Sequence, residues 1–285
     1  DKKRWKAEAE FLKAYYHFRL LEMYGPIPIV DDRMPQSTLP EDFPGRSHFD
    51  YVIDYIVNQK LNEETINAHP DVGKADDWGR ATKSAALALR GRALLYAASP
   101  LWNGKFPYPD WKNTNYETPG YGYELVSRQE DRGKWDRALQ ANLEALRVAE
   151  STGERKLVDM DNLPNTMRDV PIPYIAGVDT STVEGKEFAK RVLMLRTITA
   201  SNEDDGNKET IWGVFLQDSR AWMTFAQCPP RIICYNEANN SWADGWGAIN
   251  PTLYSVEHFY TKEGKLPNYD SNFPQGDARF ERAGI

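Results

Sequence analysis

The sequence predicts a mainly α protein in which helix pairs with long insertions pack against a loop-rich, mixed region with short strands. Three observations predict this fold class. Four segments within residues 1–151 repeat apolar side chains at three- and four-residue steps, as amphipathic helices do. The stretches between these segments are rich in Pro, Gly and Asn, which interrupt helices. From residue 152 onward, short apolar runs alternate with polar segments, which indicates a different kind of structure.

The first predicted helix covers residues 5–23 and ends before Gly25, where Pro26 and Pro28 prevent it from continuing. The second covers residues 49–65, with Ser47 as its expected N-cap. Each helix has one apolar face, formed in the first by Phe11, Ala14, Phe18 and Leu21, and in the second by Phe49, Val52, Ile53, Ile56, Val57 and Leu61.

The third predicted helix, residues 81–98, is rich in Ala and carries Gly91 near its middle. A mid-helix Gly costs about 1 kcal/mol relative to Ala, so we expect another helix to approach closely there. The fourth, residues 134–151, places Trp135 on one face with Ala138, Asn142, Ala145 and Ala149, a placement with some likeness to tetratricopeptide repeats. The helices start at irregular intervals, which indicates helix pairs with insertions and not a regular solenoid.

Two regions are therefore expected: a helix-pair scaffold over 1–151, which carries an aromatic loop at 99–133, and a loop-rich ligand-binding region over 152–285. In the second region, residues 211–216 are predicted to be a short strand and residues 251–261 a helix.

Composition narrows the function classes. The 285 residues are 41% hydrophobic and 27% charged, which is typical of a globular protein. The net charge of -7, without a basic block, argues against nucleic acid as a partner. The chain starts inside a helical pattern and ends without a finishing element, so we interpret it as an excerpt of a longer protein. Cys228 and Cys234 fit either a short-range disulfide or two unpaired thiols.

No catalytic motif stands out, and we expect no enzyme. The four histidines lie far apart in sequence, and the chain has no nucleophile elbow, Walker loop or dinucleotide fingerprint. The pairs Asp204/Asp205 and Glu237/Asp244 would suit a glycosidase, but with 42 acidic residues such pairs arise by chance. No metal site and no cofactor are expected; the Asn/Asp loops leave room for calcium, which no ligand pattern indicates.

Aromatic loops carry the stronger functional signal. Residues 102–123 and 220–246 combine Trp and Tyr rings with Asn and Asp in segments that are not periodic. A flat ring packs against the C–H face of a sugar, while amide and carboxylate groups bond its hydroxyls, and each stacked ring adds about 0.5–1.5 kcal/mol beyond area burial. The candidate ligand-binding residues are Trp102, Trp111, Trp222, Tyr235, Asn236, Asn239, Trp242 and Asp244. The alternative for each ring is that it anchors a long loop to the scaffold.

Three segments together resemble the SusD/RagB family of outer-membrane nutrient-binding lipoproteins from Bacteroidetes. They are AEAEFLKAYYHFRLLEMYGPIPIV (7–30), GRATKSAALALRGRALLYAASPLWNG (79–104) and WGAINPTLYSVEHFYTKEGK (246–265). Trp246 belongs to the third motif, which favours a structural role for it. Trp242 lies just outside that motif, among polar residues, and is therefore the better candidate for a ligand contact.

The resemblance implies tetratricopeptide-like helix pairs that support a loop-rich binding region. It also implies a non-catalytic, lipid-anchored protein on the cell surface, which captures oligosaccharide for a SusC-like TonB-dependent transporter of the outer membrane. The lipid-anchor cysteine expected of the family is absent from this chain. Two other interpretations remain open from the residues alone: a tetratricopeptide-like scaffold that binds peptides or proteins, and a glycoside hydrolase.

Overall fold

The computed structural model describes residues 1–73, 77, 79–153, 155–159, 163, 170–175, 177–201, 207–213, 233–236, 241–244, 252, 254–255, 258, 260 and 264–266. The chain forms two compact units. The first comprises Asp1–Ile172 with Lys190–Val214, and the second comprises Pro173–Ala189 with Phe215–Ile285. The division predicted from the sequence, into a scaffold over 1–151 and a ligand-binding region over 152–285, remains a prediction.

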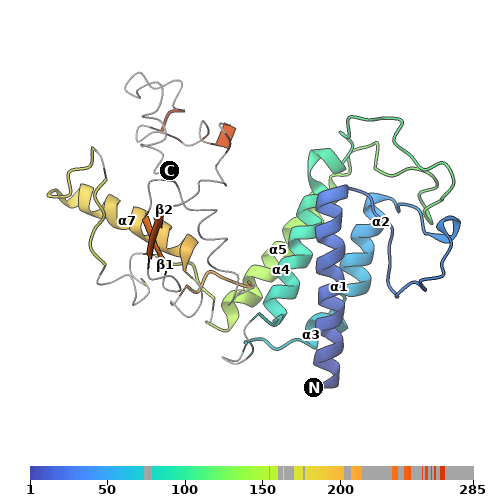
Figure 1. The fold of residues 1–285 in the computed structure, drawn as a ribbon, viewed down its shortest axis with the longest axis horizontal. Coiled ribbons are helices and arrows are strands. Elements are labelled where there is room, and N and C mark those ends of the chain that lie inside the picture. Colours follow the sequence, from blue (N-terminus) through green and yellow to red (C-terminus); the bar gives the residue numbers. More distant parts are fainter. Residues whose placement is uncertain are drawn as a thin grey trace. The chain divides into compact units, whose positions relative to one another are not determined.

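The described residues are mainly helical, which confirms the predicted fold class (Figure 1). They form six α-helices and one π-helical segment, with short 3-10 turns at Pro40–Asp42 and Pro100–Trp102 and a pair of short strands. The α-helices are α1 (Lys2–Tyr24), α2 (Phe49–Asp54), α3 (Glu63–Asn67), α4 (Lys83–Ala98), α5 (Gly133–Ser151) and α7 (Val183–Ala200). The strands are β1 (Ile233–Asn236) and β2 (Ser241–Asp244), and the π-helical segment is Tyr55–Lys60.

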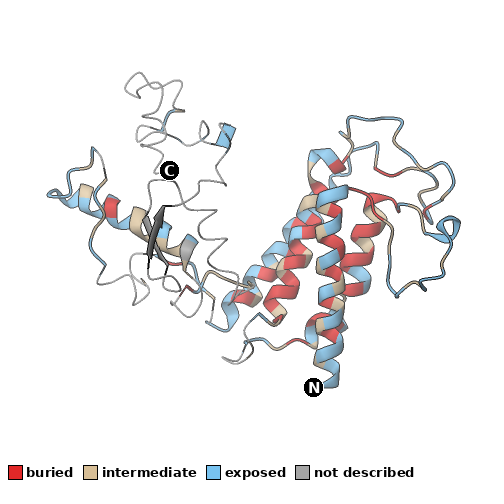
Figure 2. Ribbon diagram, in the orientation of Figure 1, coloured by how far each residue is buried: buried red, intermediate tan, exposed pale blue. Residues whose placement is uncertain are grey.

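The core of the first unit lies among α1, α2, α4 and α5, whose buried faces turn toward one another (Figure 2). Its largest side chains come from the predicted apolar faces, because those faces are the surfaces that helices can remove from water together. The fully buried ones include Phe11, Phe18, Leu21, Phe49, Val52, Ile56, Leu61 and Leu87. The apolar faces predicted for the first two helices therefore located much of the core correctly.

Helices α4 and α5 pack closely at Gly91, as the mid-helix glycine predicted. A Cβ atom at Gly91 would lie 2.7 Å from Oδ1 of Asn142 on α5. The Asn142 amide donates hydrogen bonds to the carbonyls of Gly91 (3.1 Å) and Ala138 (2.7 Å). The buried apolar side chains of α5 are Ala138, Ala141, Ala145 and Ala149, whereas Trp135 at the start of the helix is 43% exposed.

The second predicted helix is interrupted. It begins at Phe49, but Tyr55–Lys60 is π-helical, with the Leu61 amide bonded to the Ile56 carbonyl at 3.0 Å. Its N-cap is His48, whose Nδ1 accepts from the Asp50 amide at 3.1 Å. The Ser47 prediction was wrong by one residue.

Two expectations about the later residues changed. Val183–Ala200 is an α-helix within the region that was expected to be rich in loops. Residues 211–213 are not in a strand. Ile211 and Trp212 instead pack against the core of the first unit, and Trp212 Nε1 donates to the Gly79 carbonyl at 2.9 Å. Most of 251–261, the predicted helix, lies outside the described residues.

Candidate functional site

The two short strands bring together four of the predicted ligand-binding residues. β1 and β2 pair antiparallel, with Tyr235 directly opposite Trp242, Asn236 opposite Ser241, and Ile233 opposite Asp244. Residues directly opposite in an antiparallel pair are close neighbours, so Tyr235 and Trp242 are adjacent across the strands. We call this pair of strands the Tyr235–Trp242 hairpin. The other two candidates in this region, Trp222 and Asn239, lie outside the described residues.

Trp102 and Trp111 belong to a different arrangement, a series of stacked rings in the first unit. The Trp102 ring stacks on Phe49, with ring centroids 4.3 Å apart and ring planes 8° from parallel. Phe106 stacks on Trp102 at 5.5 Å, and Trp111 stacks on Phe106 at 5.0 Å. The stack therefore runs from the buried Phe49 on α2 out to the half-buried Trp111 and fixes the aromatic loop to the helices.

The outer end of the stack is held by Arg46 and Gly25. The Arg46 guanidinium lies 6.0 Å from the centroid of the Trp111 ring, and it donates to the carbonyls of Tyr24 (3.0 Å) and Pro26 (2.6 Å). Gly25 has a φ of 65°, and a Cβ there would lie 2.9 Å from Trp102 Cη2. Gly25 thus ends α1 in a conformation that favours glycine and lets the Trp102 ring approach the backbone.

These contacts bear on what the two rings can offer a ligand. Trp102 is only 6% exposed, so almost all of its ring surface is buried against other residues of the protein. The surface that remains open at this end of the loop is provided by Trp111 and by Tyr108, which is 68% exposed and meets the edge of Phe106 at 5.7 Å. The assignment of Trp102 and Trp111 as ligand contacts stays a prediction.

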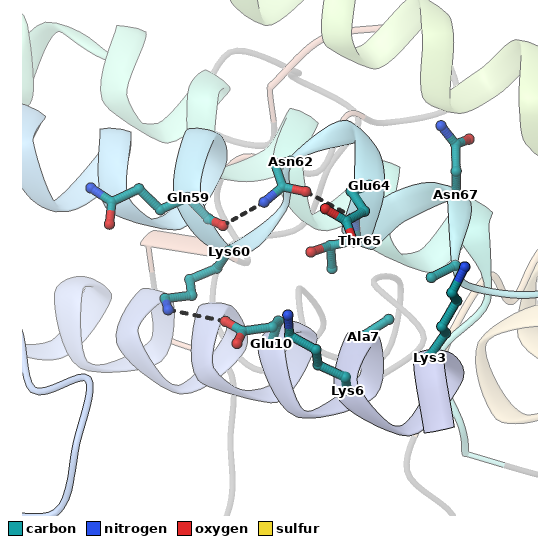
Figure 3. Close-up of a pocket in the computed structure, with 11 residues that line it drawn as sticks. Lys3, Lys6, Ala7, Glu10, Gln59, Lys60, Asn62, Glu64, Thr65 and Asn67 are labelled. Atoms are coloured by element: carbon teal, nitrogen blue, oxygen red, sulfur yellow. Dashed lines mark hydrogen bonds and ion pairs between the residues drawn. The ribbon is translucent and has the colours of Figure 1, made fainter. Parts of the chain in front are cut away.

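A polar cavity of about 400 Å³, between α1, the π-helical segment and α3, had no counterpart in the sequence analysis (Figure 3). Most of the described lining residues carry a charged or an amide side chain; the lining consists of Lys3, Lys6, Glu10, Gln59, Lys60, Asn62, Glu64, Thr65 and Asn67, with Ala7 and Ala68. Asn62 is committed to the fold, because it caps α3 through the Thr65 amide (2.9 Å) and donates to the Gln59 carbonyl (2.8 Å). The outer lysines, the amides and Glu64 give this cavity the means to hold a hydroxyl-rich ligand.

Lys60 is the inner wall of that cavity. It is 7% exposed, and its Nζ lies 3.0 Å from Glu10 Oε2 and 2.7 Å from Asp31 Oδ1. Asp31 also accepts from Lys13 (2.9 Å) and from the Tyr55 hydroxyl (2.8 Å). A signal for this buried lysine was present in the sequence, because Lys60 continues the i, i+3, i+4 pattern of the apolar face of the second helix.

The ion pairs and hydrogen bonds around Lys60 form a network that shifts the pKa values of Asp31, Tyr55 and Lys60. The hydrogen bond from Lys60, and those from Lys13 and Tyr55, hold the pKa of Asp31 well below its usual value. Burial and the bond to Asp31 raise the pKa of the Tyr55 hydroxyl. Burial alone would lower the pKa of Lys60, but the bonds to Asp31 and Glu10 outweigh it and the pKa is raised. Lys60 and Asp31 therefore remain an ion pair across the neutral range.

No group of three or more His, Cys, Asp or Glu residues is placed to hold a metal ion among the described residues. None of the helices described is both long enough and apolar enough to cross a membrane.

Comparison with known proteins identifies relatives of this fold. The family model SusD-like_3, described as "Starch-binding associating with outer membrane", matches residues 1–95. The solved structure BT4246 is 44% identical to the chain, with a TM-score of 0.77, and selenomethionine BT4246 gives 44% and 0.76. No curated protein matches the chain.

A SusD-like protein from Bacteroides fragilis (BF3747) is 20% identical, with a TM-score of 0.54, so it shares the fold. The matches to these solved structures each cover 96% of this chain, but the chain spans only 44% of BT4246 and 38% of BF3747. It therefore corresponds to less than half the length of these structures. In its sequence and in its fold, the chain is SusD-like.

Proposed function

We propose that this chain is part of a non-catalytic glycan-binding protein at the outer-membrane surface, which delivers oligosaccharide to a SusC-like TonB-dependent transporter. The observation that carries the sugar-binding proposal is the direct pairing of Tyr235 with Trp242 on a hairpin that also holds Asn236 and Asp244. Because residues alternate sides along a strand, Tyr235, Trp242 and Asp244 occupy one side of the strand pair and Asn236 the other, which supports a sugar site that combines aromatic rings with a carboxylate. The description of the matching family model, starch binding at the outer membrane, supports the same ligand class.

The transporter, the lipid anchor and the location on the cell surface rest on the family resemblance. They are tested separately, by capturing the tagged full-length protein from solubilised outer membranes and identifying what co-purifies. A TonB-dependent transporter that co-purifies in stoichiometric amount supports the partner proposal. If no such transporter co-purifies under mild detergent, the partner proposal is contradicted, and the sugar proposal is unaffected.

The sugar proposal is tested by calorimetry with a panel of oligosaccharides that begins with starch fragments. We expect affinities in the millimolar to micromolar range, about -4 to -8 kcal/mol. Trp242→Ala should weaken the binding at least fivefold, because a stacked ring is worth about 1 kcal/mol or more. The matched control is Trp135→Ala, which removes an exposed tryptophan from α5 and should leave affinity unchanged.

Three outcomes would count against this function. A blank panel contradicts sugar binding, and release of reducing ends from a polysaccharide contradicts the absence of catalysis. Equal binding by Trp242→Ala and the unmodified protein would remove the Tyr235–Trp242 hairpin from the site.

A further inference from the structure

A second, smaller cavity lies inside the first unit, between α2, α4, α5 and the loop that carries Tyr121 and Ser127. Its volume is about 160 Å³. We call it the Asp54 cavity, and its described lining residues are Asp50, Ile53, Asp54, Leu94, Ala97, Tyr121, Ser127, Asp131, Lys134 and Arg137. It adjoins a groove of about 740 Å³ along α5, with which it shares Asp54, Leu94 and Arg137. The cavity and the groove therefore border one another where α2, α4 and α5 meet.

Two of the three carboxylates in the cavity are occupied by groups of the protein. Asp50 accepts from the buried Lys134 at 2.6 Å and from the Ser127 hydroxyl, and Lys134 also donates to the Trp102 carbonyl at 3.3 Å. Asp131 accepts from the Gly133 amide at 2.8 Å and lies 3.9 Å from Arg137.

Asp54 differs from the other two carboxylates. Within the described residues its carboxylate accepts a hydrogen bond from Asn58 Nδ2 at 3.3 Å and forms no ion pair. The cavity holds three carboxylates but only two cationic side chains, Lys134 and Arg137. The cavity therefore has one more carboxylate than cationic side chains, and Asp54 is the carboxylate without an ion pair among the described residues.

The surroundings of Asp54 keep this charge poorly stabilised. Burial, with a smaller contribution from Asp50, raises the pKa of the Asp54 carboxyl, against the opposing effects of Arg137 and Lys134. Burial and the charges of Asp54 and Asp50 also raise the pKa of the Tyr121 hydroxyl, which stays a hydrogen-bond donor and acceptor. A ligand that brings a positive charge into the cavity would relieve both effects.

The wall of the cavity that Tyr121 forms is held by contacts with His48. The Tyr121 ring stacks on the buried His48, with centroids 4.0 Å apart and planes at 16°. The His48 ring accepts a hydrogen bond from the Asp50 amide, and the His48 backbone amide donates one to the Thr118 hydroxyl at 2.9 Å. The cavity thus has a defined shape before any ligand enters, which lowers the entropic cost of binding.

We propose that the Asp54 cavity binds the protonated amine of a small ligand, with Asp54 as the carboxylate that accepts it and the Tyr121 hydroxyl and Asp50 as further polar contacts. This site is separate in the sequence from the Tyr235–Trp242 hairpin and does not rest on the glycan function. Amino sugars and free amino acids carry the same group, so the proposal specifies the amine and the experiment separates the two sources.

The experiment measures binding of glucosamine, N-acetylglucosamine and lysine to the full chain by calorimetry, with backbone amide shifts in NMR spectra to locate the site. At least one amine should bind and shift the amides of Asp54 and Tyr121, while the neutral N-acetylglucosamine should not. Binding of glucosamine alone identifies an amino-sugar site, and binding of lysine alone identifies an amino-acid site. Binding of both supports the shared amine chemistry.

Three variants sharpen the test. Asp54→Asn should weaken the binding of the amine at least tenfold. Arg137→Gln should strengthen it, because it removes a nearby positive charge that repels the amine of the ligand. Glu150→Gln is the matched control, since it removes one negative charge from the exposed end of α5 and should change nothing. Lack of binding by both amines, equal binding of N-acetylglucosamine, or an unchanged affinity in Asp54→Asn would overturn the proposal.

Discussion

Among single residues, Gly91 and Asn142 determine how closely α4 and α5 pack. Gly91→Ala adds about 1 kcal/mol of helix propensity. However, the new Cβ would lie 2.7 Å from Asn142 Oδ1, so the amide must move and lose its bonds to the Gly91 and Ala138 carbonyls. Each of those bonds is worth about 1 kcal/mol. We therefore expect Gly91→Ala to lower the free energy of unfolding by about 1 kcal/mol.

In an Asn142→Ala background the sign should reverse, because only the gain in helix propensity of about 1 kcal/mol remains. Urea denaturation of the two single variants and the double variant measures this cycle. The same effect of Gly91→Ala in both backgrounds would show that the two residues are not coupled.

Gly25 provides a second prediction for a single residue. Its φ of 65° and ψ of -140° suit glycine, and a Cβ would meet Trp102 at 2.9 Å and Trp111 at 3.3 Å. Gly25→Ala should destabilise the protein by about 2 kcal/mol or more, from backbone strain together with displaced rings. Gly120→Ala is the control, because Gly120 also has a positive φ (80°) but nothing lies within 4 Å of its Cβ position. Equal losses of stability in the two variants would rule out the contribution of the rings.

The sequence predicted some of these residues and not others, for physical reasons. Gly91 was predictable because a helix tolerates a mid-helix glycine only when packing compensates for it. The choice of His48 over Ser47 as the N-cap was not, since Ser47 is the more common capping type and is instead buried, with its amide on the Ile27 carbonyl at 3.0 Å. That hydrogen bond links segments 20 residues apart, which local sequence does not report.

Among the elements, the π-helical segment Tyr55–Lys60 determines where Lys60 meets α1. Lys60→Met should lower the free energy of unfolding by about 1–3 kcal/mol, because Glu10 and Asp31 lose their buried partner. The loss belongs at the lower end of that range, because Asp31 is nearly half exposed and keeps Lys13 at 2.9 Å. Thermal and urea denaturation of Lys60→Met, compared with the exposed neighbour Gln59→Met, measure the effect. A Lys60→Met variant as stable as the unmodified protein would show that the network contributes nothing.

Element prediction succeeded where apolar periodicity was long and regular. The helices that became α1, α4 and α5 were placed to within about three residues of their observed ends. The π-helical turn had no sequence signal, because its side chains follow nearly the same apolar spacing as an α-helix. α7 was missed because its first half is polar and many of its apolar residues remain exposed, so no clear face marks it. Tertiary context, and not local pattern, decides such segments.

For the molecule as a whole, stability should fall on mild acidification. Burial lowers the pKa of His48 and of His69 below the ordinary 6.5, against smaller opposing effects of nearby carboxylates. Because these pKa values are lower in the folded protein, both imidazoles contribute stability that is complete above pH 6.5. That contribution is lost as the pH falls below 6.5 through the folded-state pKa values.

Urea denaturation between about pH 8 and pH 5 measures this dependence, in a range above the usual titration of carboxylates. His48→Asn keeps a capping side chain but removes the imidazole, so its stability should depend less steeply on pH. His258→Asn, at an exposed position, serves as the control and should keep the original slope. Stability that stays constant or rises from pH 7 to pH 5 would contradict the expected role of the buried histidines.

The fold class followed from the sequence of the whole chain, whereas the candidate site followed only in part. The aromatic and amide residues of Asn236 to Asp244 stood out by composition, but their pairing depends on the register of the strands, which composition does not report. Trp102 looked like a loop residue available to a ligand because the segment after α4 is rich in Pro and Gly. In the fold, the short 3-10 turn Pro100–Trp102 brings its ring onto Phe49.

The stack of Phe49, Trp102, Phe106 and Trp111 makes the protein its own optical reporter. Stacked aromatic rings with centroids 4.3 to 5.5 Å apart couple their electronic transitions. The stack should therefore give a distinct near-ultraviolet circular dichroism signal. That signal disappears when the aromatic loop separates from the helices, even if the helices themselves persist. Loop detachment can thus be followed without labels and distinguished from unfolding of the helical core.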